Sequence, residues 1–174
     1  MKFSFILNYE NEKEFFDHWE SKYSDSNEPV YLENINKPLT EESIQLLFEW
    51  KNGGKIALKK LQSIRKNYPL VFSGDVKERY LNPNQSGGPI WNIFYIHLLS
   101  HSVWPIFDQH VYRSMVYIKK QVIEEIPTNK ADIFTLYLKE YIPFVKAFNE
   151  KSHRRIDKAL YSYGQFLKKV KRIT

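Results

Sequence analysis

The sequence predicts an all-α domain of seven or eight helices. Apolar side chains recur at helical spacing along most of the chain, and Gly or Pro residues separate these segments. The one stretch with a strand-like pattern is residues 2–7. With 174 residues, of which 43% are hydrophobic, the chain is long enough to bury a core of its own. We therefore expect a single compact domain over residues 1–174.

Most of the expected helices have a recognisable start or end. Thr40 precedes Glu41 and Glu42 as an N-cap, and Gly53 follows that helix as part of its C-cap. Pro143 has no backbone N–H, which predicts a kink in its helix. We expect helices over residues 11–22, 41–51, 56–66, 75–80, 90–101, 108–121, 132–150 and 154–172, and a loop or an extended segment over residues 24–38.

The charge of the chain is unevenly distributed. Residues 1–50 hold 4 Lys and Arg against 11 Asp and Glu, a net charge of −7, whereas residues 51–174 hold 22 against 9, a net charge of +13. If the domain divides into lobes, we expect an acidic lobe over the first range and a basic lobe over the second. A basic excess of this kind indicates a polyanion as partner, although solvated basic helices give the same composition.

Composition excludes several classes of protein. The absence of cysteine excludes disulfides, iron–sulfur clusters and thiolate zinc sites. No apolar run reaches the ~20 residues of a membrane span, and the apolar stretch at the N-terminus is too short for a signal peptide. His97 and His101 have zinc-compatible spacing, but no Glu accompanies them. We expect a soluble cytoplasmic protein, monomeric by default, without a metal, a cofactor or a membrane partner.

The most informative motif joins a glycine turn to a carboxylate at the start of a helix. Gly87, Gly88 and Pro89 precede the run of residues 90–101, which is too apolar for a surface helix. The segment PIFDQHVYR then places Asp108 where the chain leaves the buried helix and enters the next one, 19 residues after Pro89. An Asp at this position serves as a helix N-cap, and a carboxylate beside a reacting sugar is the alternative role.

These residues resemble the helix-hairpin-helix DNA glycosylase superfamily, which includes endonuclease III and the 8-oxoguanine glycosylases. The match covers residues 87–118 and comprises the glycine turn and a segment of the form P-x-x-D-x-H-V-x-R. The resemblance implies that Asp108 is the catalytic carboxylate. Together with the basic helix after Gly53, it suggests DNA contacts from Gly87, Gly88, Pro89, His110, Arg113, Lys59 and Lys60.

The chain departs from the family pattern at two points. The hairpin reads NQSGG over residues 84–88 and lacks the apolar anchor of the family, which weakens the expected phosphate clamp. Members that also cut the strand carry a Lys in the first turn after the hairpin, whereas residues 89–92 contain no amine. The resemblance therefore implies a monofunctional enzyme, which releases a base and leaves the sugar–phosphate chain intact.

The expected substrate is a base flipped out of duplex DNA. Flipped bases stack on aromatic side chains, and those nearest the motif are Trp91, Tyr95 and Trp104, for which core packing is the alternative role. The implied function is base excision by N-glycosidic hydrolysis, in DNA repair or in defence against modified phage DNA. The alternatives are a non-catalytic DNA-binding module of the same fold and a helical protein-interaction domain. Asp108 at the mouth of a basic cleft would favour the enzyme, and a salt-bridged Asp108 without a cleft would favour the interaction domain.

Overall fold

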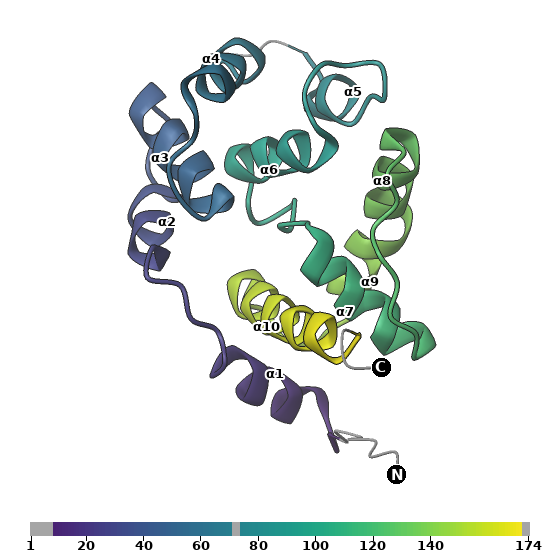
Figure 1. The fold of residues 1–174 in the computed structure, drawn as a ribbon. Coiled ribbons are helices and arrows are strands. Elements are labelled where there is room, and N and C mark those ends of the chain that lie inside the picture. Colours follow the sequence, from purple (N-terminus) through teal and green to yellow (C-terminus); the bar gives the residue numbers. More distant parts are fainter. Residues whose placement is uncertain (1–8, 71–73, 172–174) are drawn as a thin grey trace. The chain divides into compact units, whose positions relative to one another are not determined.

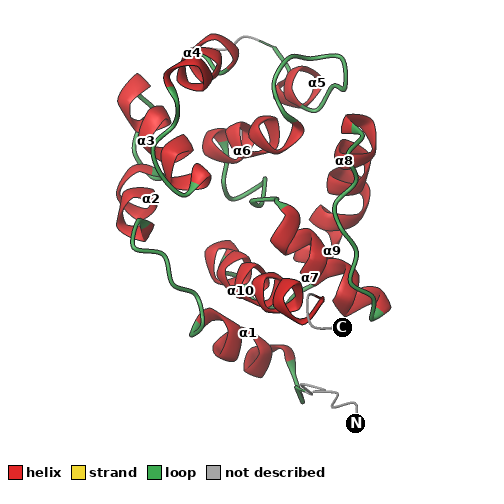
Figure 2. Cartoon of the chain, viewed as in Figure 1, coloured by secondary structure: helices red, strands yellow, loops and turns green. Residues whose placement is uncertain are grey.

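The computed structural model describes residues 9–70 and 74–171, and every regular element in these ranges is helical (Figure 1, Figure 2). The all-α prediction is confirmed for this part of the chain, and the strand-like residues 2–7 lie outside it. The elements are α1 Glu12–Glu20, α2 Glu28–Asn34, α3 Glu41–Asn52, α4 Leu58–Asn67, α5 Val76–Tyr80, α6 Pro89–Leu99, α7 Gln109–Lys120, α8 Lys130–Leu136, the π-helical η1 Tyr137–Tyr141, α9 Ile142–Lys146 and α10 His153–Lys171.

Most helices lie where the sequence predicts them, and local chemistry sets their ends. Thr40 Oγ1 accepts a hydrogen bond from Ser43 N at 3.0 Å, and Ser43 Oγ accepts one from Thr40 N at 2.8 Å. These reciprocal bonds satisfy two N–H groups that have no partner within α3. Gly53 ends α3 in the left-handed conformation, with a φ of 73°, as expected for a C-cap glycine.

Two segments differ from the prediction. Residues 28–34 form α2 rather than a loop, because Pro29 stands in the first turn, where its fixed φ suits a helix and its missing N–H needs no partner. The helix expected over residues 132–150 begins at Lys130 and ends at Lys146. Just before Pro143 the backbone forms the wider π-helical turn η1. Pro143 has no N–H to donate to the regular α-helical hydrogen-bond pattern, and the π-helical turn accommodates this missing bond.

The chain folds into two compact units, each built from segments that are distant in the sequence. Unit 1 consists of residues 1–23, 109–126 and 143–174, and unit 2 consists of residues 24–108 and 127–142. The acidic and basic stretches of the sequence do not coincide with these units, because both units combine residues from the two stretches.

Unit 1 is organised around α10, which packs against α7 and α1. The apolar stripe of α10 supplies the buried side of this helix, including Ile156, Leu160 and Leu167. Helices α7 and α10 approach very closely at Gly164, where a Cβ atom would lie 2.0 Å from the carbonyl oxygen of His110. A glycine is required at this crossing because any side chain would push the two backbones apart.

Unit 2 is organised around α6, in which every residue from Asn92 to Leu98 is buried. Helices α5 and α8 pack against α6, and α3 packs against α2 and α4. The prediction of a buried helix between the glycine turn and Asp108 is confirmed. Because α6 is enclosed by its neighbours, it provides a fixed base for the turn at its start and for the loop that follows its end.

Candidate functional site

Asp108 forms an ion pair with Lys51, a residue that the sequence analysis did not single out. The Lys51 ammonium lies 2.8 Å from Asp108 Oδ2, and the two side chains are 9% and 16% exposed. Lys51 lies in the last turn of α3 and Asp108 directly precedes α7, so the pair joins positions 57 residues apart within unit 2. Removing two charges from water costs desolvation energy, which their mutual attraction offsets. Loss of either side chain would therefore leave the other charge uncompensated.

The loop that ends at Asp108 is held by buried side chains. His97 Nδ1 lies 2.7 Å from the carbonyl oxygen of Trp104, and Nε2 lies 2.8 Å from the hydroxyl of Tyr31. A carbonyl oxygen only accepts hydrogen bonds, so Nδ1 carries a proton. The hydroxyl of Tyr137 donates a hydrogen bond to the carbonyl oxygen of Pro105 at 2.9 Å. These contacts position the backbone that leads to Asp108.

The glycine turn before α6 is shaped by a buried polar network. Gly87 has a φ of 88°, and a Cβ atom there would lie 2.5 Å from Asn92 Oδ1 and 2.7 Å from the hydroxyl of Tyr68. Asn92 accepts a hydrogen bond from that hydroxyl at 2.7 Å and donates one to the carbonyl oxygen of Ser86 at 3.3 Å. Burial raises the pKa of Tyr68, so its hydroxyl remains a donor. Residue 87 must be glycine for this network to close.

Positive charge gathers beside the glycine turn. The Lys60 ammonium lies 4.1 Å from the centre of the Trp91 ring, in the first turn of α6. Lys130, the first residue of α8, donates a hydrogen bond to the carbonyl oxygen of Gln85. The start of α6 itself has no side-chain cap, so its first N–H groups can meet an anion. Helix α4 adds exposed cations and contains no acidic residue: Lys59, Lys60, Arg65 and Lys66.

Arg113 does not lie where the sequence analysis placed it. Its side chain is 0% exposed, and its guanidinium donates to the carbonyl oxygen of Gly164 at 3.1 Å and to the Glu125 carboxylate at 2.8 Å. The prediction of a phosphate contact from Arg113 is wrong, because the guanidinium is enclosed between α7 and α10. His110 is half-buried, and its ring packs edge-on against Tyr161 with centroids 4.9 Å apart, so the ring takes part in packing.

The three aromatic residues expected to stack on a flipped base are engaged in packing. Tyr95 is 0% exposed and donates its hydroxyl to the carbonyl oxygen of Pro69, so the prediction that it binds a base is wrong. Trp91 stacks on Phe48 with an interplanar angle of 12°. Trp104 is half-buried and faces Tyr137 at 6.5 Å. Packing is therefore the role that the structure shows for these side chains.

The net charge of the chain resides in unit 1. That unit holds 15 Lys and Arg against 9 Asp and Glu, a net charge of +6, and α10 alone contributes six cations against one Asp. Unit 2 holds 11 of each sign and is neutral. The positive charge around the glycine turn is therefore a local concentration on α4 rather than a property of the whole unit.

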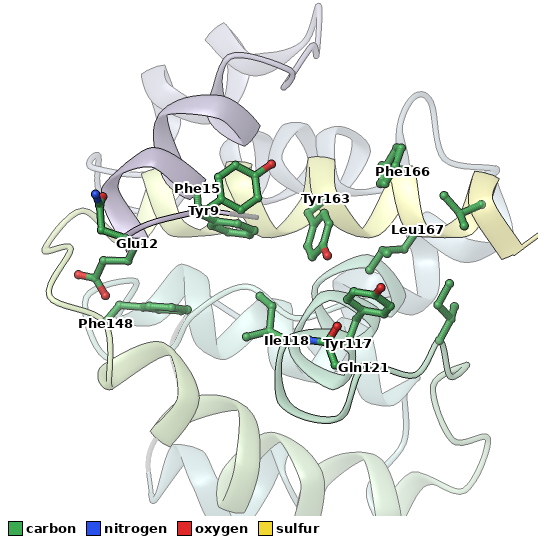
Figure 3. A pocket seen from close by; sticks show the side chains of 13 residues that line it. Tyr9, Glu12, Phe15, Tyr117, Ile118, Gln121, Phe148, Tyr163, Phe166 and Leu167 are labelled. Carbon is green, nitrogen blue, oxygen red and sulfur yellow. The ribbon is translucent and has the colours of Figure 1, made fainter. Parts of the chain in front are cut away.

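Unit 1 also contains a cavity of about 580 Å³, bordered by α1, α7 and α10. Side chains of Tyr163, Tyr117 and Ile118 point into it (Figure 3). Glu12 is the one carboxylate among the described residues of its lining, and burial raises the pKa of Tyr163, so that hydroxyl stays neutral. The cavity contains none of the predicted site residues, and we assign it no part in base excision.

Sequence reasoning missed Lys51 because nothing near it in the chain indicates chemistry. A Lys in the last turn of a helix is favoured by the helix dipole, and it is ordinarily expected on the protein surface. The available signal was indirect: Lys51 belongs to a basic run that starts where the acidic stretch ends. Only the packing of α3 in unit 2 brings its ammonium to Asp108.

Comparisons of the chain with protein-family models, with curated proteins and with solved structures find no match. Within residues 9–70 and 74–171, no group of three or more His, Asp and Glu side chains could hold a metal ion. In the same ranges, no helix is long and apolar enough to cross a membrane. Any proposal for the function of this protein therefore rests on the geometry around Asp108.

Proposed function

We propose that this protein excises a damaged or modified base from DNA by cleaving the N-glycosidic bond, in base repair or in defence against modified phage DNA, in the cytoplasm. The observation that carries the proposal is Asp108, a shielded carboxylate held by Lys51 at 2.8 Å directly before α7. Unit 2 presents the glycine turn, the buried α6 and Asp108 in the order expected from the resemblance to helix-hairpin-helix DNA glycosylases.

Base excision requires one carboxylate and a nucleophile. The bond to the base breaks through an oxocarbenium-like state, and the Asp108 carboxylate stabilises the positive charge that develops on the sugar. It also orients or deprotonates the attacking water. The ammonium of Lys51 stabilises the negative charge on Asp108, and the ionised carboxylate is the form that electrostatic stabilisation of the sugar requires. In the monofunctional form of the proposal, water completes the reaction and the strand remains whole.

DNA binding in this proposal depends on the glycine turn and on α4. The uncapped N–H groups that follow Gly87 and Gly88 bind a phosphate, and Lys59 and Lys60 bind neighbouring phosphates. Pro89 starts α6 and needs no hydrogen-bond partner for its nitrogen. Such contacts set the register on the duplex without reading its sequence.

A DNA-binding module without chemistry and a helical protein-interaction domain are the other candidates, and the salt bridge of Asp108 is the arrangement expected of the interaction domain. A carboxylate that is 16% exposed and bonded to an ammonium also serves as a structural contact within unit 2, between α3 and the loop that follows α6. These readings differ from the first in one measurable property, which is the release of a base.

The proposal is tested by incubating the full chain with duplexes that carry a panel of damaged and modified bases, followed by alkaline cleavage at abasic sites. Asp108→Asn should abolish base release. Asp75→Asn is the matched control, because Asp75 caps α5 by accepting a hydrogen bond from Glu78 N at 2.9 Å and lies outside the site. Release that persists in Asp108→Asn would remove Asp108 from the mechanism. Binding without release on any duplex would establish the non-catalytic module.

A further inference from the structure

We propose that a pocket between α1 and α10 binds a small phosphate monoester, a ligand that takes no part in the proposed base excision. The pocket lies within unit 1, where these two helices pack against each other. Its volume is about 420 Å³, which is within the range of small-molecule sites in proteins. The residues of its lining that bear on the ligand are His18, Trp19, Lys22, Ser162, Phe166 and Lys169.

Ser162 provides the observation that points to a ligand. It is 6% exposed, and its hydroxyl oxygen is buried without a hydrogen-bond partner. A serine inside a helix ordinarily donates its hydroxyl to a backbone carbonyl oxygen one turn earlier, and a buried polar group without any partner lowers stability. Because Ser162 lines the pocket, an oxygen atom of a bound ligand would supply the missing partner.

The charges around this hydroxyl favour an anion. Lys22 follows α1 and Lys169 lies in the last turn of α10, so each of the two bordering segments contributes an ammonium group to the lining. The ring of His18 contributes a further nitrogen atom. No carboxylate occurs among the described residues of the lining, and unit 1 as a whole has a net charge of +6. An anion in the pocket would therefore be attracted without a competing negative group.

The helix dipole gives a second reason for these lysines, but it does not explain the hydroxyl. Lys22 and Lys169 both lie near the C-terminal ends of helices, where cations are favoured. A dipole effect does not require a serine at a buried position, and a water molecule bonded to Ser162 would leave both ammonium groups unused. A phosphate monoester satisfies all three groups, since it has several acceptor oxygens and a charge of about −1.5 to −2 near pH 7.

The apolar side of the pocket indicates that the phosphate is attached to an organic group. Phe166 is half-buried, and its ring lies 5.2 Å from the ring of Trp19, measured between centroids. Ser162, Phe166 and Lys169 are spaced by 4 and 3 residues, so they lie along one face of α10. A free phosphate ion would leave this aromatic side uncovered. An ester with an aromatic or aliphatic group would bury it and gain affinity from the apolar contact.

A small ligand fits the surroundings of the pocket better than a macromolecule does. Arg155 and Lys171, which precede and follow the pocket residues of α10, are bonded to carboxylates of unit 1, so they are already engaged. Binding to a lipid surface requires apolar side chains that enter the bilayer beside the cations. The exposed large apolar side chains of the described residues lie outside α1 and α10.

The test is calorimetric titration of the full chain with phenyl phosphate. We expect one molecule to bind per chain, inorganic phosphate to bind more weakly, and phenol, which lacks the phosphate, not to bind. Ser162→Ala should weaken the binding of phenyl phosphate by about tenfold, because the hydroxyl donates to a charged acceptor. This variant removes a hydroxyl without a partner, so it should remain folded. Lys169→Gln should weaken binding by about tenfold as well and reduce its dependence on salt.

Lys120→Gln is the matched control, because it removes one positive charge from an exposed position of unit 1 outside the pocket. It should leave the affinity for phenyl phosphate unchanged, and a loss equal to that of Lys169→Gln would overturn the inference. The absence of phenyl phosphate binding, equal binding of phenol or inorganic phosphate, or native affinity in Ser162→Ala would do the same. Weaker binding of Ser162→Ala to labelled duplex DNA or to anionic vesicles, with phenyl phosphate unaffected, would assign the pocket to a macromolecule instead. Base release on the duplex panel is measured separately, so failure of this inference leaves the proposed function standing.

Discussion

Gly164→Ala is the substitution whose effect the structure defines most sharply, because two opposing contributions can be compared. Helix propensity alone favours Ala over Gly by about 1 kcal/mol in the middle of a helix such as α10. Against this, the new Cβ would lie 2.0 Å from the His110 carbonyl oxygen, 2.6 Å from its carbonyl carbon and 2.8 Å from its Cα. These neighbours are backbone atoms of α7 and cannot rotate away.

Real Cβ atoms keep at least 3.0 Å from such neighbours, so α7 and α10 must separate by about 1 Å at the crossing. Overpacking of this kind costs about 1–3 kcal/mol. Two hydrogen bonds span the same crossing, from Arg113 to the Gly164 carbonyl oxygen at 3.1 Å and from Ser114 to the Leu160 carbonyl oxygen at 2.6 Å, and weakening each adds about 1 kcal/mol. After the gain in propensity is subtracted, we expect a net loss of about 2–4 kcal/mol in the free energy of unfolding.

The assay is urea denaturation followed by circular dichroism, with Ser162→Ala as the control on the same helix. The Ser162 hydroxyl is buried without a hydrogen-bond partner, so its removal should change stability by less than about 1 kcal/mol. A Gly164→Ala protein as stable as the native chain, or more stable, would show that the crossing of α7 and α10 is looser than described. It would then leave helix propensity as the dominant contribution at this position.

Three further predictions concern the site and the core. Asn caps helices well, so Asp108→Asn would be nearly neutral as a cap replacement. The loss of the Lys51 partner should nevertheless lower the free energy of unfolding by about 1–3 kcal/mol in the same assay. The further change Lys51→Met should recover part of this loss, and strictly additive effects would contradict a coupled pair. Duplex DNA affinity should fall by at least about tenfold between ~50 and ~200 mM salt in a fluorescence anisotropy titration, because phosphate contacts release counterions, and a flat salt response would rule out the contacts assigned to α4. Burial raises the pKa of Tyr68, Tyr95 and Tyr163, so above pH 10 the folded protein keeps protons that the unfolded chain loses. The contribution of these tyrosines to stability is complete below pH 10 and decreases as the pH rises above it. The urea midpoint should therefore fall steadily from pH 9.5 to 11, and a constant midpoint would exclude this linkage.

The helices could be predicted because their signals are local. Thr40 and Gly53 mark the two ends of α3 by side-chain capping and by a left-handed backbone, and both depend only on neighbouring residues. The apolar run of α6 predicted its burial for the same reason. Helix α2 was not predicted, because proline disfavours a helix everywhere except in its first turn. The sequence around Pro29 does not show that the helix begins there.

The candidate site could be predicted only in part. Asp108 and the glycine turn were found through their spacing, which is a property of the chain. The role of Arg113 was misjudged, because a cation one turn into a helix has the same local sequence whether it faces solvent or, as here, Gly164 and Glu125. Lys51 was overlooked, since its only relevant partner lies 57 residues away.

The sequence by itself determined the helical class, the buried α6 and the position of a carboxylate at the start of α7, because periodicity, capping and composition act over a few residues. The tertiary structure decided which charges meet. The packing of α3 in unit 2 brings Lys51 to Asp108, and the close approach of α7 and α10 at Gly164 encloses Arg113. An ion pair of this kind depends on distance and burial between remote segments, and neither quantity is defined until the chain has folded.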